Sequence, residues 1–349
     1  MTEKLQHKIE NIISLDNQAD DREILFQLKQ LLYEMELQNY TETETKNIAD
    51  IIYENIQQLD NEKSHNDVIK SGFDDLDKLV GGFRLGEFIV IGGRPAMGKT
   101  QFLINISLNI SSSTPVLYVT LDLSEFLLTS RFASSASEIP SDNIINHSLS
   151  EIEKNILSSI AGELKSNHQL FIHDSCNTSI AALKAYCQKQ IQEKGIKVVI
   201  VDYLQLLTSY QHRKYRENEV SYICRELKNL AKEYNVCVIA SSQLSRAVEL
   251  RHPPLPQLSD LRESGAIEQD ADKVLFIYRP EYYGFKEDEN LETLQGIAEI
   301  IVAKNKSGRL GSFKLRTNYN NLSDLKNCFT FSSHRLSELN LENLGDLPF

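Results

Sequence analysis

The segment from Gly93 to Thr100 has the residue types and the spacing of a loop that binds the phosphates of a nucleotide. It fits the pattern of Gly, four residues, Gly, Lys and Ser or Thr. Glycines at both ends allow backbone N–H groups to turn towards a phosphate chain. Lys99 would neutralise the β- and γ-phosphates, and the Thr100 hydroxyl would hold Mg²⁺. The residues of the loop are Gly93, Arg94, Pro95, Ala96, Met97, Gly98, Lys99 and Thr100.

The segments on both sides of this loop predict the strand and the helix that such a loop requires. Residues 87–92 are mainly apolar and predict a short buried strand, whereas residues 101–108 have the apolar spacing of a helix. The helix would direct the positive end of its dipole at the phosphates. A plain glycine-rich turn is the alternative, but it would not explain both flanks.

Two carboxylates follow predicted strands. Asp202 ends the apolar run 198–201, and in hydrolases with a phosphate loop such an Asp holds Mg²⁺. Asp122 follows residues 119–121 and would orient the attacking water as general base, because ligands sit at the carboxyl ends of parallel strands. Each has an alternative role as a helix cap. Ser124, however, could cap the helix that follows Asp122.

Three polar side chains at other strand ends are candidates for contacts to the γ-phosphate. Gln243 ends the run 239–242 and could report the loss of that phosphate; the alternative is a polar turn. Lys304 and Lys306 follow an apolar strand and precede Gly308, so they could reach the γ-phosphate of a neighbouring subunit. By composition alone, an exposed turn explains these two lysines better.

Two polar segments bear on nucleic-acid binding. Residues 209–216 mix tyrosines with cations, among them Arg213 and Lys214, and this composition suits single-stranded nucleic acid. A solvated loop is the alternative. Residues 260–270 form a polar stretch with one glycine, and its chemistry alone is ambiguous.

The pattern after residue 71 is one of strands alternating with helices. Strands are expected at 88–92, 116–121, 170–173, 198–202, 237–241, 274–278, 298–303 and 313–316. Helices are expected at 100–110, 125–136, 179–193 and 219–234, with Gly195 as the C-cap of the third. This alternation predicts an α/β fold with a mainly parallel sheet covered on both faces. The closely spaced late strands predict an antiparallel extension.

Residues 1–65 predict a short all-helical segment that contains no glycine. Residues 66–335 would form the main domain, and residues 336–349 a tail. The two apolar stripes of the helical segment consist of Ile24, Leu25, Leu28, Leu31 and Leu32, and of Ile48, Ile51, Ile52 and Ile56.

The bulk composition excludes several classes of protein. The 349 residues are 41% hydrophobic, and no apolar run approaches the roughly 18 residues of a membrane helix. Residues 1–10 are polar, unlike a secretory signal, and no Cys-x-x-Cys pair occurs. We expect a reduced cytoplasmic protein without structural zinc. The net charge of −12 is concentrated in residues 1–60, which hold 13 acids against five Lys and Arg, so the remainder can carry a local basic channel.

Taken together, these segments resemble the C-terminal ATPase domain of the DnaB-type replicative helicases, from about residue 71 to residue 324. The Asp-Leu-Arg-Glu-Ser-Gly core of residues 260–265 separates this family from recombinases that share the phosphate loop. The other segments that carry the resemblance are residues 71–77, 93–100, 201–206 and 242–246.

The resemblance implies a RecA-like fold, a homohexameric ring and ATP sites with Mg²⁺ at the subunit interfaces. It implies that Arg262, Glu263 and Gly265 line a central channel and touch single-stranded DNA, with Arg213 and Lys214 in the other channel loop. It also implies that Lys304 and Lys306 act in trans. A primase or a loader protein is an expected partner, and 5′–3′ polarity is expected.

The chain departs from the family pattern in three places. The family usually has Glu at Asp122, an arginine finger at Lys306, and a globular helical N-terminal domain where residues 1–65 leave room for a short helical piece. We interpret the chain as a ring-shaped DNA helicase that hydrolyses ATP. The alternatives are a recombination-mediator ATPase, and an ATP-binding switch with weak hydrolysis.

Overall fold

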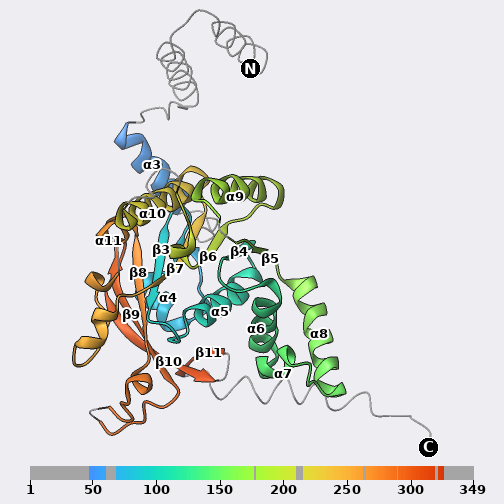
Figure 1. Cartoon of the computed structure of the whole chain (residues 1–349). Coiled ribbons are helices and arrows are strands. Elements are labelled where there is room, and N and C mark those ends of the chain that lie inside the picture. The colour runs from blue at the N-terminus through green and yellow to red at the C-terminus, as the bar shows by residue number, and fades with distance from the viewer. Residues whose placement is uncertain are drawn as a thin grey trace, which may run out of the picture. The chain divides into compact units, whose positions relative to one another are not determined.

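The chain divides into two units, which comprise residues Met1–Ser64 and His65–Phe349. The computed structural model describes residues 47–59, 68–176, 178–209, 215–261, 265–288, 290–318 and 321–325 (Figure 1). In the first unit, helix α3 (Ile48–Leu59) is present where the second apolar stripe predicts a helix. Ile48, Ile52 and Ile56 are exposed on it. The first stripe, Ile24 to Leu32, and the tail 336–349 lie outside the described residues.

The second unit is built on a nine-stranded sheet with the order β11-β10-β9-β8-β3-β7-β6-β4-β5. The strands from β8 to β5 are parallel, whereas β9, β10 and β11 extend the sheet antiparallel, as the late strand patterns predict. The bounds are β3 Phe88–Gly93, β4 Val116–Thr120, β5 Leu170–Asp174, β6 Val198–Asp202, β7 Cys237–Gln243, β8 Lys273–Tyr278, β9 Ile297–Asn305, β10 Gly311–Asn318 and β11 Asn321–Asp324.

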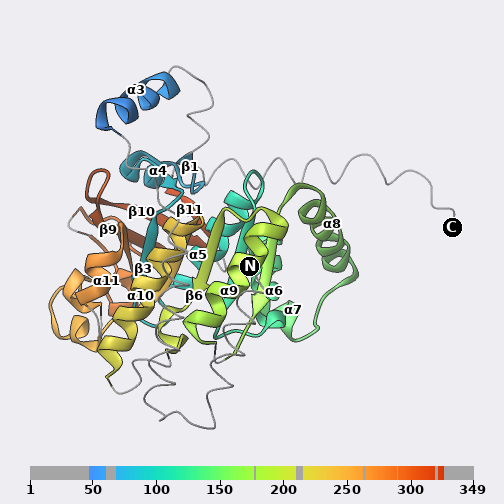
Figure 2. The ribbon, with the colours of Figure 1, turned by 90° about the horizontal axis from the view of Figure 1, so that it is seen from above.

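Helices cover both faces of this sheet because successive side chains of a strand point to opposite faces. Along β3, Ile89 and Ile91 join one buried cluster, whereas Phe88 and Val90 join the other. Figures 1 and 2 show the resulting layers of helices around the strands. The first face is covered by α4 (Asp74–Val80), α5 (Lys99–Ser111) and α6 (Glu125–Ser137), and the second by α9 (Ile180–Lys194), α10 (Arg216–Glu233) and α11 (Gly265–Asp270).

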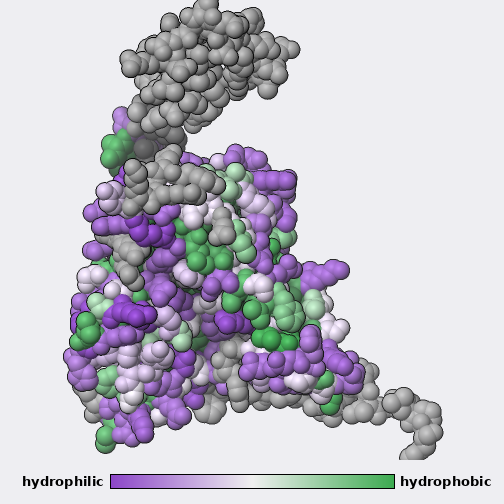
Figure 3. Space-filling view, in the orientation of Figure 1, coloured by the Kyte–Doolittle hydropathy of each residue, from purple (hydrophilic) through white to green (hydrophobic). Residues whose placement is uncertain are grey.

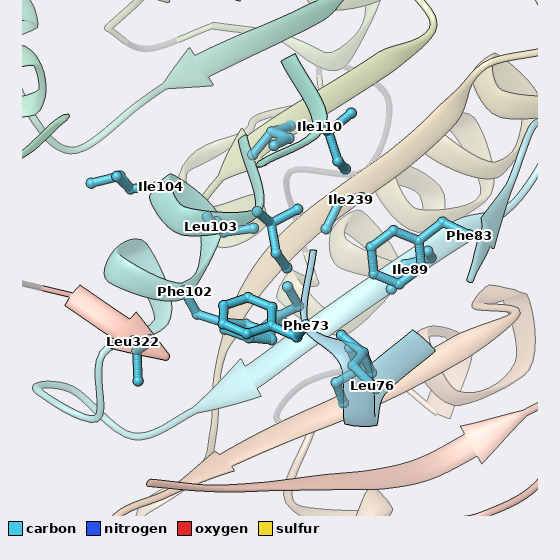
Figure 4. Close-up of a cluster of buried hydrophobic side chains, with 14 of the residues drawn as sticks. Phe73, Leu76, Phe83, Ile89, Phe102, Leu103, Ile104, Ile110, Ile239 and Leu322 are labelled. Carbon is cyan, nitrogen blue, oxygen red and sulfur yellow. The ribbon is translucent and has the colours of Figure 1, made fainter. Parts of the chain in front are cut away.

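The core on the first face fixes helix α5, which begins directly after the glycine-rich loop. Figure 4 shows Phe102 and Leu103 of α5 packed among Phe73, Ile89 and Ile239. The rings of Phe73 and Phe102 stack with their centroids 5.3 Å apart. Because these side chains are almost fully buried, the start of α5 is held rigidly against the ends of the strands.

The strands and helices predicted after residue 71 are present, and the structure adds several elements that were not predicted. Each expected strand is found with its ends within two residues, and Gly195 is the C-cap of α9 with a φ of 65°. The largest addition is α8 (Glu151–Asn167), a helix of 17 residues that begins with a capping box formed by Ser150 and Glu153. The other elements are β1 Val68–Ile69, β2 Phe83–Arg84, α7 Ser141–Ile145, η3 Leu204–Leu206, η4 Arg246–Leu250, η5 Leu258–Asp260 and η6 Pro280–Tyr283.

The surface of the second unit is mixed in character. Figure 3 shows that hydrophilic residues cover most of the visible face, with hydrophobic residues in small patches. Within the described ranges, no helix combines the length and the apolar composition that crossing a bilayer would need.

Candidate active site

The glycine-rich loop connects the carboxyl end of β3 to the first turn of α5. Gly98 has a φ of 95° and Ala96 a φ of 64°, so the backbone turns tightly before the helix begins at Lys99. Met97 is buried and anchors the loop in the core, whereas Pro95 and Ala96 are exposed. The loop therefore presents its backbone and the positive end of the α5 dipole at the edge of the sheet, where an anion can bind.

Lys99 lies inside this loop. Its Nζ donates hydrogen bonds to the carbonyl oxygens of Gly93 at 2.9 Å and of Arg94 at 3.1 Å. Burial lowers the pKa of the Lys99 ammonium to about 8, although the nearby carboxylates of Asp202 and Asp122 act in the opposite direction. Both predicted carboxylates therefore lie close enough to influence the charge of this lysine.

The Arg94 side chain contacts residues outside the loop, whereas Lys99 contacts carbonyl oxygens within it. Its Nε lies 2.8 Å from Glu249 Oε1, and its Nη1 donates to the carbonyl oxygen of Leu244 at 3.0 Å. These contacts tie the glycine-rich loop to the segment that follows β7. Arg94 thus supports the loop from outside.

The Asp202 carboxylate at the end of β6 is 4% exposed and lies beside the start of α5. Thr100 Oγ1 donates to its Oδ2 at 2.7 Å, Tyr118 OH donates to the same oxygen at 3.0 Å, and Ser241 Oγ donates to Oδ1. A hydroxyl and a carboxylate at this distance are the oxygen ligands that Mg²⁺ takes in proteins. The arrangement fits the predicted metal ligands, Thr100 and Asp202.

Asp122 is exposed and lies two residues beyond Thr120, the last residue of β4, which pairs with Asp202 in the sheet. Thr120 Oγ1 closes the turn that presents it, donating to Leu123 O at 2.7 Å and accepting from Leu123 N at 3.1 Å. Ser124 caps α6 by accepting from the backbone of Leu127, so the cap position is filled by Ser124. Glu125, the first residue of α6, is also exposed. The role of Asp122 as general base stays a prediction.

Gln243 ends β7, which lies between β3 and β6 in the sheet. Its backbone N–H donates to Gln205 Oε1 at 3.2 Å, and Gln205 Nε2 donates to Ser242 Oγ at 2.8 Å and to the Gln243 carbonyl at 3.2 Å. The main chain of Gln243 is thus fixed, and this half-exposed residue ends the strand between β3, which leads into the glycine-rich loop, and β6, which ends in Asp202.

Lys304 and Lys306 lie near the amino ends of the parallel strands, whereas the glycine-rich loop and Asp202 lie at the carboxyl ends. Lys304 pairs with Val274 at the start of β8, a strand parallel to β3, and the Lys306 N–H donates to the carbonyl oxygen of Asp272 just before that strand. A strand as long as β3 spans about 20 Å at roughly 3.3 Å per residue, so neither lysine can reach the loop of its own chain. Lys306 Nζ lies 3.1 Å from Asp272 Oδ1, and the Lys306 side chain is 47% exposed.

Lys304 is engaged differently from Lys306. Its Nζ donates to the carbonyl oxygens of Glu268 and, at 3.2 Å, Gln269 near the end of α11. Burial and, after it, the charge of Lys306 lower the pKa of Lys304. Lys304 therefore caps a helix of its own subunit, whereas Lys306 is the more accessible cation.

The predicted DNA-binding residues Arg213, Lys214, Arg262 and Glu263 lie outside the described residues. Gly265 is described and begins α11. The flanks of both segments are anchored near Gln243. Leu261 pairs with Leu244 in an antiparallel bridge, and Ser245 N donates to Asp260 O at 2.8 Å.

Several residues at these anchors were not predicted from the sequence. Arg216, which follows the segment 210–214, donates to the carbonyl oxygen of Gln205 and pairs with Glu219. The Arg251 guanidinium makes a two-pronged contact with the buried Asp260 carboxylate. Tyr118 and Ser241 were missed as well, because their roles depend on contacts between distant segments. A tyrosine inside an otherwise aliphatic strand was the available signal for Tyr118.

Sequence comparison relates this site to known proteins. Residues 68–324 match the family described as DnaB-like helicase C terminal domain. Replicative DNA helicase DnaC of Bacillus subtilis (strain 168) is 40% identical over 276 residues, which cover 77% of this chain and 60% of that protein. Replicative DNA helicase DnaB of Geobacillus stearothermophilus is 39% identical over the same length and with the same shares. The chain thus spans about three fifths of the length of these curated relatives.

Solved structures agree with this relationship. One, named "The Structure Of A DnaB-Like Replicative Helicase And Its Interactions With Primase", matches with a TM-score of 0.73 and 32% identity over 93% of this chain and 76% of that chain. Another solved structure, of an ATPase domain, matches with a TM-score of 0.72 and 34% identity over 81% of this chain and 100% of that chain. The RecA-like α/β fold and the resemblance inferred from the sequence are confirmed, and the chain belongs to the family of DnaB-like helicase C-terminal domains.

Proposed function

We propose that this chain hydrolyses ATP at the carboxyl edge of its sheet and uses the energy to move along single-stranded DNA and unwind duplex DNA during replication. The observation that carries the proposal is the hydrogen bond between Thr100 Oγ1 and Asp202 Oδ2, 2.7 Å long, next in the chain to Lys99 and close enough for Asp202 to act on the charge of that lysine. These groups come from two segments about a hundred residues apart, and each has the type that phosphoryl transfer requires.

The residues at this edge divide the chemistry of hydrolysis between them. Lys99 and the backbone of the loop bind the phosphates, and Thr100 with Asp202 would hold Mg²⁺, which supplies charge neutralisation when bound. Asp122 takes a proton from the attacking water as the water oxygen bonds to the γ-phosphorus and the bond to the bridging oxygen breaks. Gln243 lies where it can contact the γ-phosphate before cleavage and lose that contact afterwards.

The position of Lys306 supports a site that is shared between subunits. Since Lys306 lies at the amino edge of the sheet, it can serve only the ATP of a neighbouring copy. In a closed ring each copy offers one edge to its neighbour, so every interface contains one phosphate loop and one Lys306. We infer a homohexamer of this kind, in line with the family.

The anchors around Gln243 support coupling between ATP and DNA. The flank of segment 210–214 is held by the bond from Arg216 to Gln205, and the flank of segment 262–264 by the bridge between Leu261 and Leu244. Both anchors are bonded to residues at or beside Gln243. We infer that Arg213, Lys214, Arg262, Glu263 and Gly265 contact the DNA backbone. A primase or loader protein would be a further partner, and 5′–3′ polarity would follow the family.

A slow ATP-dependent switch is the second candidate function. It is favoured by Asp122 and Lys306, which replace the usual Glu and Arg of the family. Lysine keeps the charge of arginine but lacks its planar fork of donors. The recombination-mediator alternative is not favoured, because the family match extends over residues 68–324.

The first prediction tests the function itself. Lys99→Ala should abolish both ATP hydrolysis stimulated by single-stranded DNA and unwinding of a forked duplex, because the cation that neutralises the phosphates is removed. Circular dichroism should show an unchanged fold, since Lys99 lies at the edge of the core. A parent protein that hydrolyses ATP but separates no strands would instead favour the switch, and unchanged turnover in Lys99→Ala would rule out the assigned site.

The second prediction concerns pH. Burial lowers the pKa of Lys99 to about 8; the lysine must be protonated to bind phosphates, and bound phosphates would raise that pKa. Above about pH 8, ADP binding is then accompanied by the uptake of a proton. The affinity for ADP should therefore not change with pH below about pH 8, and should fall by up to about tenfold per pH unit above about pH 8. Calorimetry from about pH 7.5 to about pH 9.5 measures this slope. Lys99→Arg, which stays charged, is the matched control and should bind with little dependence on pH.

The third prediction concerns the general base. Asp122→Asn should lose hydrolysis while keeping its affinity for ATP, because the amide keeps the size but cannot accept the proton. Asp122→Glu should hydrolyse faster, since a misplacement of about 1 Å costs on the order of 10²-fold in rate. Steady-state turnover measures both. Parent-like turnover in Asp122→Asn would transfer the role to Glu125, and Glu125→Gln would then be the inactive variant.

The fourth prediction tests whether the site is shared. Lys306→Ala and Lys99→Ala should each be inactive alone, but mixed rings should regain activity because an intact phosphate loop can face an intact Lys306 across some interfaces. Turnover measured against the mixing ratio should pass through a maximum. Lys306→Ala mixed with Asp122→Asn provides a second complementing pair. A flat line at zero for both mixtures would show that Lys306 does not act in trans.

A further inference from the structure

The carboxylate of Asp202 is held by hydroxyl groups from three different elements. Thr100 belongs to helix α5, Tyr118 to strand β4 and Ser241 to strand β7. The strands β4 and β7 flank β6 on its two sides. Thr100 is a predicted metal ligand, whereas the mechanism of hydrolysis gives no task to Tyr118 or Ser241.

The sheet register explains how the two flanking hydroxyls reach one carboxylate. Thr120 of β4 pairs with Asp202, and Tyr118 lies two residues earlier, so its side chain points to the same face as Asp202. On the other side Val201 pairs with Ala240, which brings Ser241 beside Asp202. The Tyr118 ring is fully buried under α5 and meets the Phe132 ring edge to face, with centroids 5.6 Å apart.

The phenol is fixed as a donor. A carboxylate accepts hydrogen bonds and has none to donate, so the Tyr118 hydroxyl is the donor in this contact. A buried hydroxyl without a partner would cost free energy, and the one acceptor that the structure assigns to it among the described residues is Asp202 Oδ2. The geometry therefore aims the Tyr118 proton at the same oxygen that Thr100 contacts.

We propose that Tyr118 is a positioning residue that holds the Asp202 carboxylate in its metal-binding orientation throughout the ATP cycle; this inference rests on the proposed function. If the Thr100 hydroxyl turned to a metal ion, Oδ2 would keep Tyr118 as a donor and Oδ1 would keep Ser241. The carboxylate would stay bonded on both oxygens, and these two bonds would oppose its rotation. Each oxygen can accept up to two hydrogen bonds, so both would retain free acceptor capacity.

If Asp202 holds Mg²⁺, it would do so in the orientation that Tyr118 and Ser241 fix. Removing a partner that orients a metal-holding side chain typically costs about 10- to 100-fold in metal affinity. The consequence should appear in the dependence of nucleotide binding on Mg²⁺.

The experiment measures equilibrium binding of a fluorescent ADP analogue across a range of Mg²⁺ concentrations, without turnover. In Tyr118→Phe the Mg²⁺ concentration for half-maximal binding should rise by about tenfold, the low end of the effects seen for such partners. Binding measured in EDTA should stay unchanged, because the phosphate contacts of the loop are intact. Ser241→Ala, which removes the donor on the other oxygen, should shift the midpoint in the same direction.

Phe132→Leu is the matched control for a purely structural effect. It loosens the packing of the Tyr118 ring but touches no atom of Asp202, so it should lower the thermal midpoint without moving the Mg²⁺ midpoint. An equal Mg²⁺ shift in Phe132→Leu, or no shift in Tyr118→Phe, would overturn the role of Tyr118. A parent protein that binds no nucleotide at any Mg²⁺ concentration would instead overturn the proposed function, and this role with it.

Discussion

The structure depends on a buried carboxylate at the end of a central strand. Burying a charge is costly unless hydrogen bonds replace its water, and Asp202 receives these bonds only if helix α5 and two neighbouring strands are all in place. Any slip of β4 or β7 against β6 would remove a donor. The contacts that stabilise the buried carboxylate also bring the residues of the candidate site together. The candidate site can therefore form only when the strands of the sheet are in the correct register.

A second set of contacts connects the end of strand β7 to the flanks of the two predicted DNA-binding segments. Gln205 is bonded to the main chain of Gln243 and also accepts from Arg216, and Leu244 is bridged to Leu261. A shift of Gln243 must therefore displace the flanks of both predicted DNA segments, because hydrogen bonds of this kind do not stretch freely. If Gln243 contacts the γ-phosphate and these segments contact DNA, as we propose, the bonds form a short physical route between the two ligands.

The sequence predicted the parts of the fold whose pattern is local. The parallel strands are buried on both faces and form continuous apolar runs, so their bounds were found closely. Helix α8 has no buried residue and was missed, although Ile152, Ile156 and Ile160 recur at helical spacing and the capping box at its start was a further signal. The motif residues Lys99, Thr100 and Asp202 were predicted from their chemistry. Tyr118 and Gln205 were not, because their roles arise from contacts across the sheet.

Two of the departures from the family pattern would act on one reaction in the proposed mechanism, although they lie at opposite ends of the parallel strands. Asp122 is at the carboxyl end and Lys306 at the amino end, so in the proposed ring the Asp122 of one subunit and the Lys306 of the next would face the same ATP. The first would set how well the water is activated, and the second how well the developing charge is neutralised. Effects on one transition state are coupled. The double variant Asp122→Glu with Lys306→Arg should therefore lower the activation barrier by more than the sum of the decreases in the two single variants, as measured in a double-mutant cycle.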